Sequence, residues 1–350
     1  MTVEYMTAAV LFETEKPLQI ICNIRLPPLD AGQVQVKVLF SGLCHSQLME
    51  VSGGRGEDKY LPHLLGHEGV GIVEKIGEGV TKVNVGDKVV IGWIKGVGMD
   101  VSGARFPHQN IVINSGAATT LSSHTIVAEN RVVILPKGFP DELAVLLGCA
   151  LPTGLGLVFN ELQPAKHKQI AVFGLGGVGM SVLLAARYSE PTMLIAVDVT
   201  DEKLAIAKQL GATHTINASQ VDPVTEIQRL TAGIGVDYSL EAGGTTHTIE
   251  QAFAVVRDGG GQCVFASHPK EGESIRLEPH AFHRGKKIRG SWGGGSQPDE
   301  DIKKFAELYQ QGGMPLEALI SKEYSLLDIN TALDDMANKR IIRALINTQI

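Results

Sequence analysis

The chain has 350 residues, a length at which one hydrophobic core usually gives way to two, so we expect two domains. Hydrophobic residues make up 44% and charged residues 20%, and no apolar run approaches the roughly 18 residues that suggest a membrane span. The net charge of -7 disfavours a nucleic-acid partner, because contact with phosphates needs a clustered basic face. These values predict a soluble globular protein that binds neither membranes nor nucleic acids.

The cysteines and the start of the chain bear on its compartment. The four cysteines, at positions 22, 44, 149 and 263, are too few and too scattered for a disulfide framework. The first five residues contain neither a basic nor an apolar signal region, so secretion is not expected. We therefore predict a cytoplasmic protein whose thiols stay reduced and available to a metal.

The first part of the chain is rich in short β-prone runs separated by glycine. Residues 8–11, 34–38 and 87–91 are the clearest of these runs. Short strands punctuated by glycine are typical of an irregular all-β domain, which we place at residues 1–152.

Two cysteines and one histidine in this domain form a candidate metal site. Cys44 and Cys149 each lie in a glycine-rich turn, and His67 also follows a glycine. Two thiolates and one imidazole suit a catalytic zinc, whose fourth position stays open, whereas structural zinc is usually closed by four protein ligands. The pattern therefore indicates catalysis. Cys22 and Cys263 lie in apolar runs, and we interpret them as buried core residues.

After residue 152 the pattern changes to strands that alternate with helix-length segments. This alternation predicts a parallel, doubly wound sheet over residues 153–292. The predicted strands are 170–173, 193–197, 236–240, 262–266 and 287–292, and the predicted helices include 203–210 and 246–256. The last part of the chain, 293–350, contains predicted helices at 299–311 and 328–338 and a final strand near 343–346.

A glycine-rich turn follows the first strand of the predicted sheet. Gly174, Gly176 and Gly179 form a G-x-G-x-x-G pattern between an apolar strand and an apolar helix, the context in which this motif indicates a dinucleotide. The glycines allow a tight turn, close approach of the backbone to the pyrophosphate, and packing of helix on strand. Asp198 ends the next strand, where a carboxylate binds the adenosine ribose and repels a 2′-phosphate, so NAD is predicted over NADP. The alternative is a packing turn in which Asp198 caps the following helix.

These residues resemble the zinc-dependent medium-chain alcohol dehydrogenases. The resemblance is carried by Gly66-His67-Glu68-x-x-Gly71-x5-Gly77-x-x-Val80, by Gly148-Cys149 and by the glycine turn, and it runs from about residue 7 to 347. It implies an α/β protein with a chaperonin-10-like (GroES-like) irregular β-barrel as catalytic domain, to which residues 293–350 return, and a Rossmann domain. It also implies one catalytic zinc on Cys44, His67 and Cys149, and NAD as the cofactor.

The resemblance assigns roles to further residues. Ser46 matches the hydroxyl that takes the substrate proton, and Glu68 matches a carboxylate that lies beside the metal or visits it. An ordinary turn hydroxyl and a plain ion pair are the alternatives. Trp93 matches an aromatic wall of the substrate pocket, although an apolar core residue would look the same.

The remaining matches are cofactor contacts. Arg343 and His45 match residues at the pyrophosphate, and a surface imidazole is the alternative for His45. Lys203 matches a position at the ribose, where a cation could partly tolerate a 2′-phosphate. The other cofactor contacts are Thr153, Gly177 and Val178.

Three positions depart from the family pattern. Residues 95–114 contain none of the four cysteines that hold a structural zinc in many members, so one zinc per chain is expected. Without that zinc, the stretch 96–103 must be ordered by packing and turns or be mobile. Gln47 replaces the usual aspartate that accepts a hydrogen bond from the zinc-bound imidazole. A neutral amide can accept that bond, but it raises the basicity of His67 less than a carboxylate would. Met49 replaces a relay histidine found in some members, which leaves the outer proton path to water or another group.

The sequence therefore predicts an NAD-dependent, single-zinc alcohol dehydrogenase that interconverts a primary or secondary alcohol and its aldehyde or ketone. A polyol, sugar or aminocyclitol dehydrogenase is the alternative, because such members of the family also lack the structural zinc. A zinc-free reductase or a non-enzymatic nucleotide-binding relative is opposed by the presence of all three ligands. We expect small-molecule partners and a homodimer or homotetramer, with residues 287–292 as the place where subunits would join.

Overall fold

The computed structural model describes residues 4–349, and the chain divides into two compact units. Unit 1 comprises the chain up to Cys149 together with the segment from Gln297 onward, and unit 2 comprises Ala150–Ser296. The predicted boundaries, after residues 152 and 292, lie a few residues from the observed ones. Within the described residues, no single helix has the length and hydropathy to cross a bilayer. The segments 141–148 and 150–162 meet that test only when joined across a break.

Unit 1 is built on two β-sheets. In the first sheet the strand order is β2 (Gln19–Arg25), β1 (Tyr5–Leu11), β4 (His63–Leu64), β8 (Ile111–Asn114) and β7 (Arg105–His108). In the second sheet it is β10 (Val132–Ile134), β6 (Lys88–Ile91), β5 (Gly69–Ile76), β3 (Gln33–Leu43), β18 (Ala344–Asn347) and β17 (Lys322–Ser325), and β9 (His124–Ala128) also pairs with β3. The prediction of a β-rich first domain is confirmed.

The pairing of β18 with β3 brings the end of the chain to the metal site. The two strands are antiparallel, with Ala344 opposite Leu43. Arg343, which precedes Ala344, therefore lies beside Cys44, which follows Leu43.

One expectation for this unit is wrong. Cys22 is exposed, because β2 is the edge strand of its sheet and buries few of its side chains. The helices of unit 1 are short apart from α9: α1 (His45–Val51), η1 (Glu129–Arg131), α2 (Asp141–Ala144), η2 (Val145–Gly148), α9 (Pro298–Gln310), η6 (Leu316–Leu319), η7 (Leu326–Asp328) and α10 (Ile329–Ala337).

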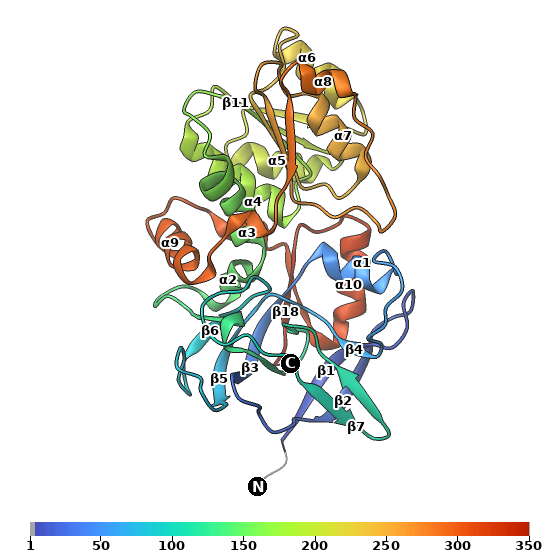
Figure 1. Ribbon diagram of the computed structural model, residues 1–350, viewed down its shortest axis with the longest axis vertical. Helices are drawn as coiled ribbons and strands as arrows, with labels where there is room; N and C mark the ends of the chain where they lie inside the picture. The colour runs from blue at the N-terminus through green and yellow to red at the C-terminus, as the bar shows by residue number, and fades with distance from the viewer. Residues whose placement is uncertain (1–3, 350) are drawn as a thin grey trace. The chain divides into compact units, whose positions relative to one another are not determined.

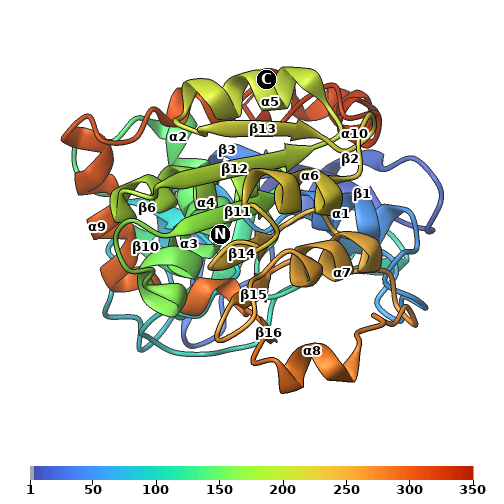
Figure 2. The same ribbon diagram turned by 90° about the horizontal axis from the view of Figure 1, so that it is seen from above.

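Unit 2 contains one parallel sheet. Figure 2 shows its strands side by side in the order β13 (His214–Asn217), β12 (Met193–Asp198), β11 (Gln169–Phe173), β14 (Tyr238–Glu241), β15 (Gln262–Phe265) and β16 (Lys287–Gly290). This 3-2-1-4-5-6 order is that of a doubly wound dinucleotide-binding sheet, as predicted. The central strands are apolar and buried along most of their length, because helices cover both faces. Cys263 in β15 is buried, in agreement with its interpretation as a core residue.

The helices of unit 2 precede, connect and follow these strands (Figure 1). They are α3 (Ala150–Gly156), the π-helix η3 (Leu157–Leu162), α4 (Gly177–Ala186), η4 (Arg187–Ser189), α5 (Asp201–Gln209), α6 (Pro223–Leu230), α7 (Thr246–Ala254), α8 (Pro279–His283) and η5 (Gly293–Gly295). The predicted helices at 203–210 and 246–256 correspond to α5 and α7. The strand β13 was not predicted, because only one of its four residues is buried and the segment lacks a clear apolar pattern.

Candidate metal centre and nucleotide-binding turn

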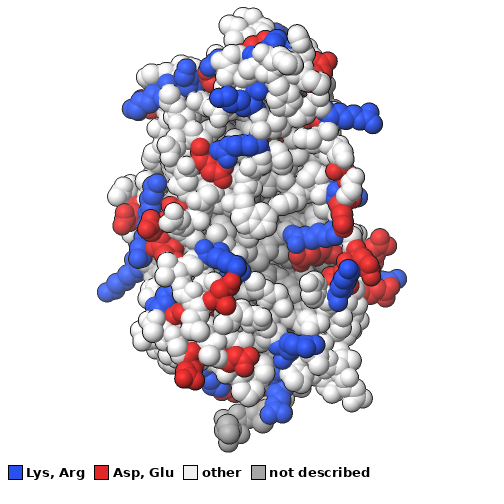
Figure 3. Space-filling model, in the orientation of Figure 1, with Lys and Arg blue, Asp and Glu red and all other residues white. Residues whose placement is uncertain are grey.

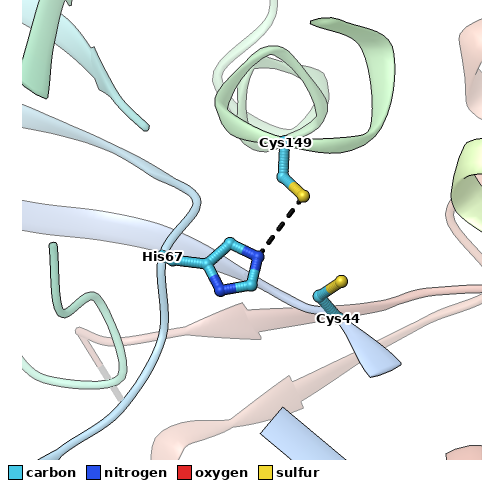
Figure 4. Close-up of side chains that lie close together, drawn as sticks. All are labelled: Cys44, His67 and Cys149. Carbon is cyan, nitrogen blue, oxygen red and sulfur yellow. Dashed lines mark hydrogen bonds between the residues drawn. The ribbon is translucent and has the colours of Figure 1, made fainter. Parts of the chain in front are cut away.

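Three segments of unit 1 bring the candidate metal ligands together. Cys44 follows β3 as the N-cap of α1, His67 lies in the connection from β4 to β5, and Cys149 follows η2. Their donor atoms all lie within 4.8 Å of one another, and His67 Nε2 is 3.3 Å from Cys149 Sγ. Figure 4 shows the three side chains pointing toward one another. Two thiols and an imidazole at these separations fit a tetrahedral zinc with one position left for substrate.

Glycines allow these segments to approach closely around Glu68. A Cβ atom on Gly42 would lie 2.6 Å from Glu68 Cδ, and one on Gly148 would lie 2.9 Å from Glu68 Cα. Larger residues at these positions would therefore force the segments apart. The hydroxyls of Ser41 and Thr120 donate hydrogen bonds to the Glu68 carbonyl oxygen at 3.2 and 3.1 Å. The backbone next to His67 is thus held by steric fit and by hydrogen bonds within the protein.

The two cysteines of the site differ in acidity. The Cys149 thiol donates a hydrogen bond to the Cys44 sulfur, which lowers the pKa of Cys44 well below its ordinary value and raises the pKa of Cys149. Burial opposes protonation of His67, but the hydrogen bond and charge of Cys44 raise its pKa. Cys44 therefore loses its thiol proton more readily than Cys149, and a metal bound here would displace the proton of Cys149.

A buried ion pair lies beside the metal site. Glu68 is fully buried, Arg343 is 3% exposed, and the Arg343 guanidinium donates to Glu68 Oε1. Burial raises the pKa of Glu68 to about 7, although the positive charge of Arg343 acts in the opposite direction. Among the described residues, Glu68 Oε2 and Arg343 Nε have no hydrogen-bond partner. Glu68 Oε2 can therefore accept, and Arg343 Nε can donate, a hydrogen bond to another group. The pyrophosphate contact of Arg343 stays a prediction.

Two side chains of α1 contact the far side of the His67 ring. Gln47 Oε1 accepts a hydrogen bond from the Cys44 backbone N–H at 2.9 Å, and Gln47 Nε2 lies 2.6 Å from His67 Nδ1. The contact between Gln47 and His67 is as predicted, but its direction is not. Because Gln47 Oε1 accepts the Cys44 N–H, the Nε2 group of the amide is the one that faces the His67 ring. Ser46 Oγ lies 3.4 Å from the same Nδ1 atom, where its hydroxyl accepts when Nδ1 carries the proton and donates when Nδ1 does not.

The glycine turn of unit 2 has the geometry that a dinucleotide requires. Gly174 adopts φ +82°, and a Cβ atom on Gly179 would lie 1.8 Å from the Gly174 carbonyl oxygen, so no side chain fits there. A Cβ atom on Gly176 would meet nothing within 4 Å, so this part of the turn is open. Since α4 begins at Gly177, its first backbone N–H groups point out of the helix, where a phosphate can accept them.

Asp198 links this turn to the end of β12. Its Oδ2 accepts the N–H of Leu175 at 2.7 Å, and its Oδ1 accepts those of Val199 and Thr200 at 2.8 and 3.1 Å. The N-cap of α5 is Thr200, so Asp198 is not the cap that the alternative interpretation required. The carboxylate therefore stands at the carboxyl end of the strand, in the place expected for a ribose ligand.

The other predicted site residues lie in the following places. His45 is exposed at the start of α1, Trp93 is half-buried just after β6, Thr153 is buried in α3, Val178 is half-buried in the first turn of α4, and Lys203 is half-buried in α5. Within the described chain, Thr153 Oγ1 is a buried hydroxyl without a hydrogen-bond partner, which suits a cofactor-binding residue. The cofactor and substrate contacts of this group stay predictions.

The chain is similar to known proteins along nearly its whole length. Residues 30–137 match the alcohol dehydrogenase GroES-like domain, and residues 177–311 match the zinc-binding dehydrogenase domain. The S-(hydroxymethyl)glutathione dehydrogenase of Synechocystis sp. is 33% identical, over 97% of this chain and 99% of that protein. Benzyl alcohol dehydrogenase from Acinetobacter calcoaceticus has a crystal structure that is 30% identical, with a TM-score of 0.87 over 98% of this chain and 99% of that one. The alcohol dehydrogenase zinc-binding domain protein from Burkholderia ambifaria is 31% identical, with a TM-score of 0.89 over 99% of both chains.

The chain belongs to the zinc-containing alcohol dehydrogenase family. The predicted family, its α/β fold with a GroES-like and a Rossmann domain, and zinc as a cofactor are thereby confirmed, and the cluster of Cys44, His67 and Cys149 fits a catalytic zinc. Sequence reasoning missed two features of the site. It did not pair Glu68 with Arg343. It also did not notice the buried Glu129, which holds residues 81, 82 and 99, although an ionisable residue between the apolar strands β9 and β10 is a signal that could have identified it.

We expect Gln47→Asp to slow the loss of zinc to a chelator by roughly 10- to 100-fold, the usual range for changes behind a metal-bound histidine. A carboxylate can accept from both the Cys44 N–H and His67 Nδ1–H, whereas the amide oxygen serves only Cys44. The measurement is the rate of inactivation by a chelator, with Gln47→Glu as a second variant that keeps the length of the side chain. Equal or faster zinc loss from both variants would show that an acceptor at position 47 for His67 Nδ1–H does not limit zinc retention.

Proposed function

We propose that this protein is a zinc-dependent alcohol dehydrogenase that transfers a hydride reversibly between a primary or secondary alcohol and NAD. The observation that carries the proposal is the convergence of Cys44, His67 and Cys149 within 4.8 Å, in a chain that also carries a dinucleotide-binding sheet. Cys44, His67 and Cys149 would hold the zinc, which would lower the pKa of the alcohol hydroxyl by several units, toward roughly 7, and NAD would supply the hydride acceptor.

The residues of this chain prepare the substrate for that chemistry. Ser46 is proposed to accept the hydroxyl proton at Oγ while its own hydroxyl proton passes on to water, a role that suits a group able both to donate and to accept. The match of Ser46 to the family hydroxyl supports this role, and Ser46 Oγ lies 3.4 Å from Nδ1 of His67. Trp93 is proposed to form an apolar wall that excludes water from the reacting carbon.

A screen of alcohols with purified protein and NAD tests this function. Ethanol, benzyl alcohol, S-(hydroxymethyl)glutathione, 2-butanol and sorbitol cover the primary, aromatic, thiol-linked, secondary and polyol classes. We expect NADH formation with one of the first four, and loss of that activity after zinc removal. Activity confined to sorbitol would favour the polyol dehydrogenase instead, and zinc-independent turnover would contradict the proposal.

We expect the enzyme to prefer NAD over NADP by at least about tenfold, or about 1.4 kcal/mol, because Asp198 would face a 2′-phosphate at short range. Asp198→Gly should shift the ratio of kcat/KM values toward NADP. Asp198→Asn is the matched variant, since it removes the charge and keeps an acceptor for the Leu175 N–H. Equal use of both cofactors by the wild type would mean that Lys203 or another neighbour outweighs the carboxylate.

The remaining parts of the proposal concern the surroundings of the enzyme. On the face shown in Figure 3, acidic and basic side chains are interspersed, which supports small-molecule partners over nucleic acid. The edge strand β16 carries exposed residues, and we propose it as the contact of a homodimer or homotetramer, to be tested by light scattering in solution. A cytoplasmic location is proposed because free thiols at a zinc site need a reducing compartment, and cell fractionation would test it.

A further inference from the structure

Three consecutive polar residues hold the segment 92–100, which lies in the part of the chain that lacks the structural-zinc cysteines. Glu129, Asn130 and Arg131 form η1, and they are 2%, 4% and 9% exposed. Buried polar groups require hydrogen-bond partners. Most of the partners of these three residues lie in the segment 92–100, so the segment is ordered by polar contacts rather than left mobile.

The Glu129 carboxylate accepts hydrogen bonds from three backbone N–H groups. Its Oε1 accepts the backbone N–H groups of Thr81 and Lys82 at 2.6 and 2.7 Å, and its Oε2 accepts that of Met99 at 2.8 Å. Burial raises the pKa of this carboxyl group, but the three backbone donors lower it, and the net shift is downward. A Cβ atom on Gly98 would lie 2.8 Å from Glu129 Cγ, so the segment packs directly on this side chain. One ionised carboxylate therefore joins two segments of the chain, as a metal ion with backbone ligands would.

Arg131 extends this attachment to Trp93. Its guanidinium donates to the Trp93 carbonyl oxygen, and its own carbonyl oxygen accepts the Gly92 N–H at 3.0 Å. Asn130 adds three hydrogen bonds, from Gly96 N–H to Asn130 O at 2.8 Å, from Asn130 N–H to Met99 O at 3.3 Å and from Asn130 Nδ2 to Asp100 Oδ1 at 3.1 Å. The backbone of Trp93 is thus fixed by the same three-residue group that contains Glu129.

A second carboxylate contacts the segment from α9. Asp299 Oδ2 accepts the Val97 N–H at 2.6 Å, and Asp299 Oδ1 pairs with Lys82 Nζ at 2.5 Å. Lys82 Nζ also donates to the Val97 carbonyl oxygen at 2.9 Å. Lys82 therefore connects the Asp299 contact with the Glu129 contact, because its backbone N–H is one of the donors to Glu129.

We propose that Glu129 is a positioning residue for substrate binding. Its buried carboxylate closes the segment 92–100, that is, it joins the segment to residues 81–82 as a metal ion with backbone ligands would, and it thereby fixes Trp93 at the substrate pocket. The proposal rests on the proposed function where it places Trp93 beside the substrate, whereas the closure of the segment stands on the contacts alone. Alcohols with a bulky apolar group, which would pack against Trp93, depend on this closure more than ethanol does.

Glu129→Gln tests the proposal in a Trp292→Phe background, where Trp93 is the remaining one of the two tryptophans. Glutamine keeps the size of the side chain but offers one acceptor oxygen to three donors. We expect acrylamide to quench Trp93 more strongly and trypsin to cleave after Lys95 roughly tenfold faster, because the segment opens more often. KM for benzyl alcohol should rise about tenfold, while kcat and the KM for ethanol stay within about twofold. The zinc content should stay at that of the parent protein.

Glu300→Gln is the matched control, because it neutralises an exposed carboxylate of α9 and should leave all of these values unchanged. Asp299→Asn loosens the segment from its other side, so it replaces Glu129→Gln if that variant does not fold, and the same pattern is expected. Unchanged quenching and cleavage would overturn the proposal, as would a loosened segment with an unchanged KM for benzyl alcohol. A wild type that oxidises no alcohol would refute the proposed function, while fluorescence and proteolysis would still decide whether Glu129 closes the segment.

Discussion

Replacing Cys149 with serine is expected to remove zinc and activity together while the protein stays folded. The change leaves two of three ligands, and a serine hydroxyl is a much poorer zinc ligand than a thiolate. We expect about one zinc per chain in the wild type, almost none in the variant, and a kcat/KM lower by at least about 10³-fold, or roughly 4 kcal/mol. Metal analysis, the rate of NADH formation and circular dichroism provide the three readouts. The fold should persist because apolar clusters, not the metal, form the core of unit 1.

Cys263→Ala is the control for this experiment. Cys263 is also buried, but it lies in β15 of unit 2 and is not one of the clustered ligands, so its loss should lower stability and leave zinc content unchanged. Two zinc ions per chain in the wild type, or full zinc retention by Cys149→Ser, would contradict the assignment of the site.

Replacing Arg343 with methionine is expected to destabilise the protein by roughly 3–5 kcal/mol, because it leaves the buried Glu68 carboxylate without its cation. Methionine has a similar length and no charge. For a unit of this size, such a loss lowers the melting temperature by roughly 6–20 °C. Calorimetry of the zinc-free protein isolates this effect from metal binding.

The pH dependence and a double variant test the cause of this loss. Glu68 in the wild type has a pKa raised to about 7, so the stability it contributes is complete below about pH 4.5 and is lost as the pH rises through 7. Without Arg343 its pKa rises further, so the deficit of Arg343→Met should be larger at pH 8 than at pH 5.5. Adding Glu68→Gln should restore part of the stability. A deficit that is independent of pH and unchanged in the double variant would show that lost packing, not the unpaired charge, is the cause.

The architecture of unit 2 could be predicted well because its signals are local. The apolar strand β11, the glycine turn and the apolar helix α4 lie next to one another in the chain, and each follows from the residues it contains. The absence of a side chain at Gly179 is required by its own turn, 1.8 Å from the Gly174 oxygen. The strand β13 escaped prediction because its four residues carry little apolar pattern, and its place is set by pairing with β12.

The candidate zinc ligands, the dinucleotide turn and the family could be predicted from the sequence, because ligand chemistry and glycine conformation are properties of the residues themselves. What surrounds these residues depends on the tertiary structure. Glu68 and Arg343 are 275 residues apart and meet because β18 pairs with β3. The amide of Gln47 presents its donor to His67 because the Cys44 N–H occupies its oxygen, and Glu129 closes the segment 92–100 because strand pairing places η1 beside it. Such contacts depend on packing between distant segments, so neither residue of a pair indicates its partner in the sequence.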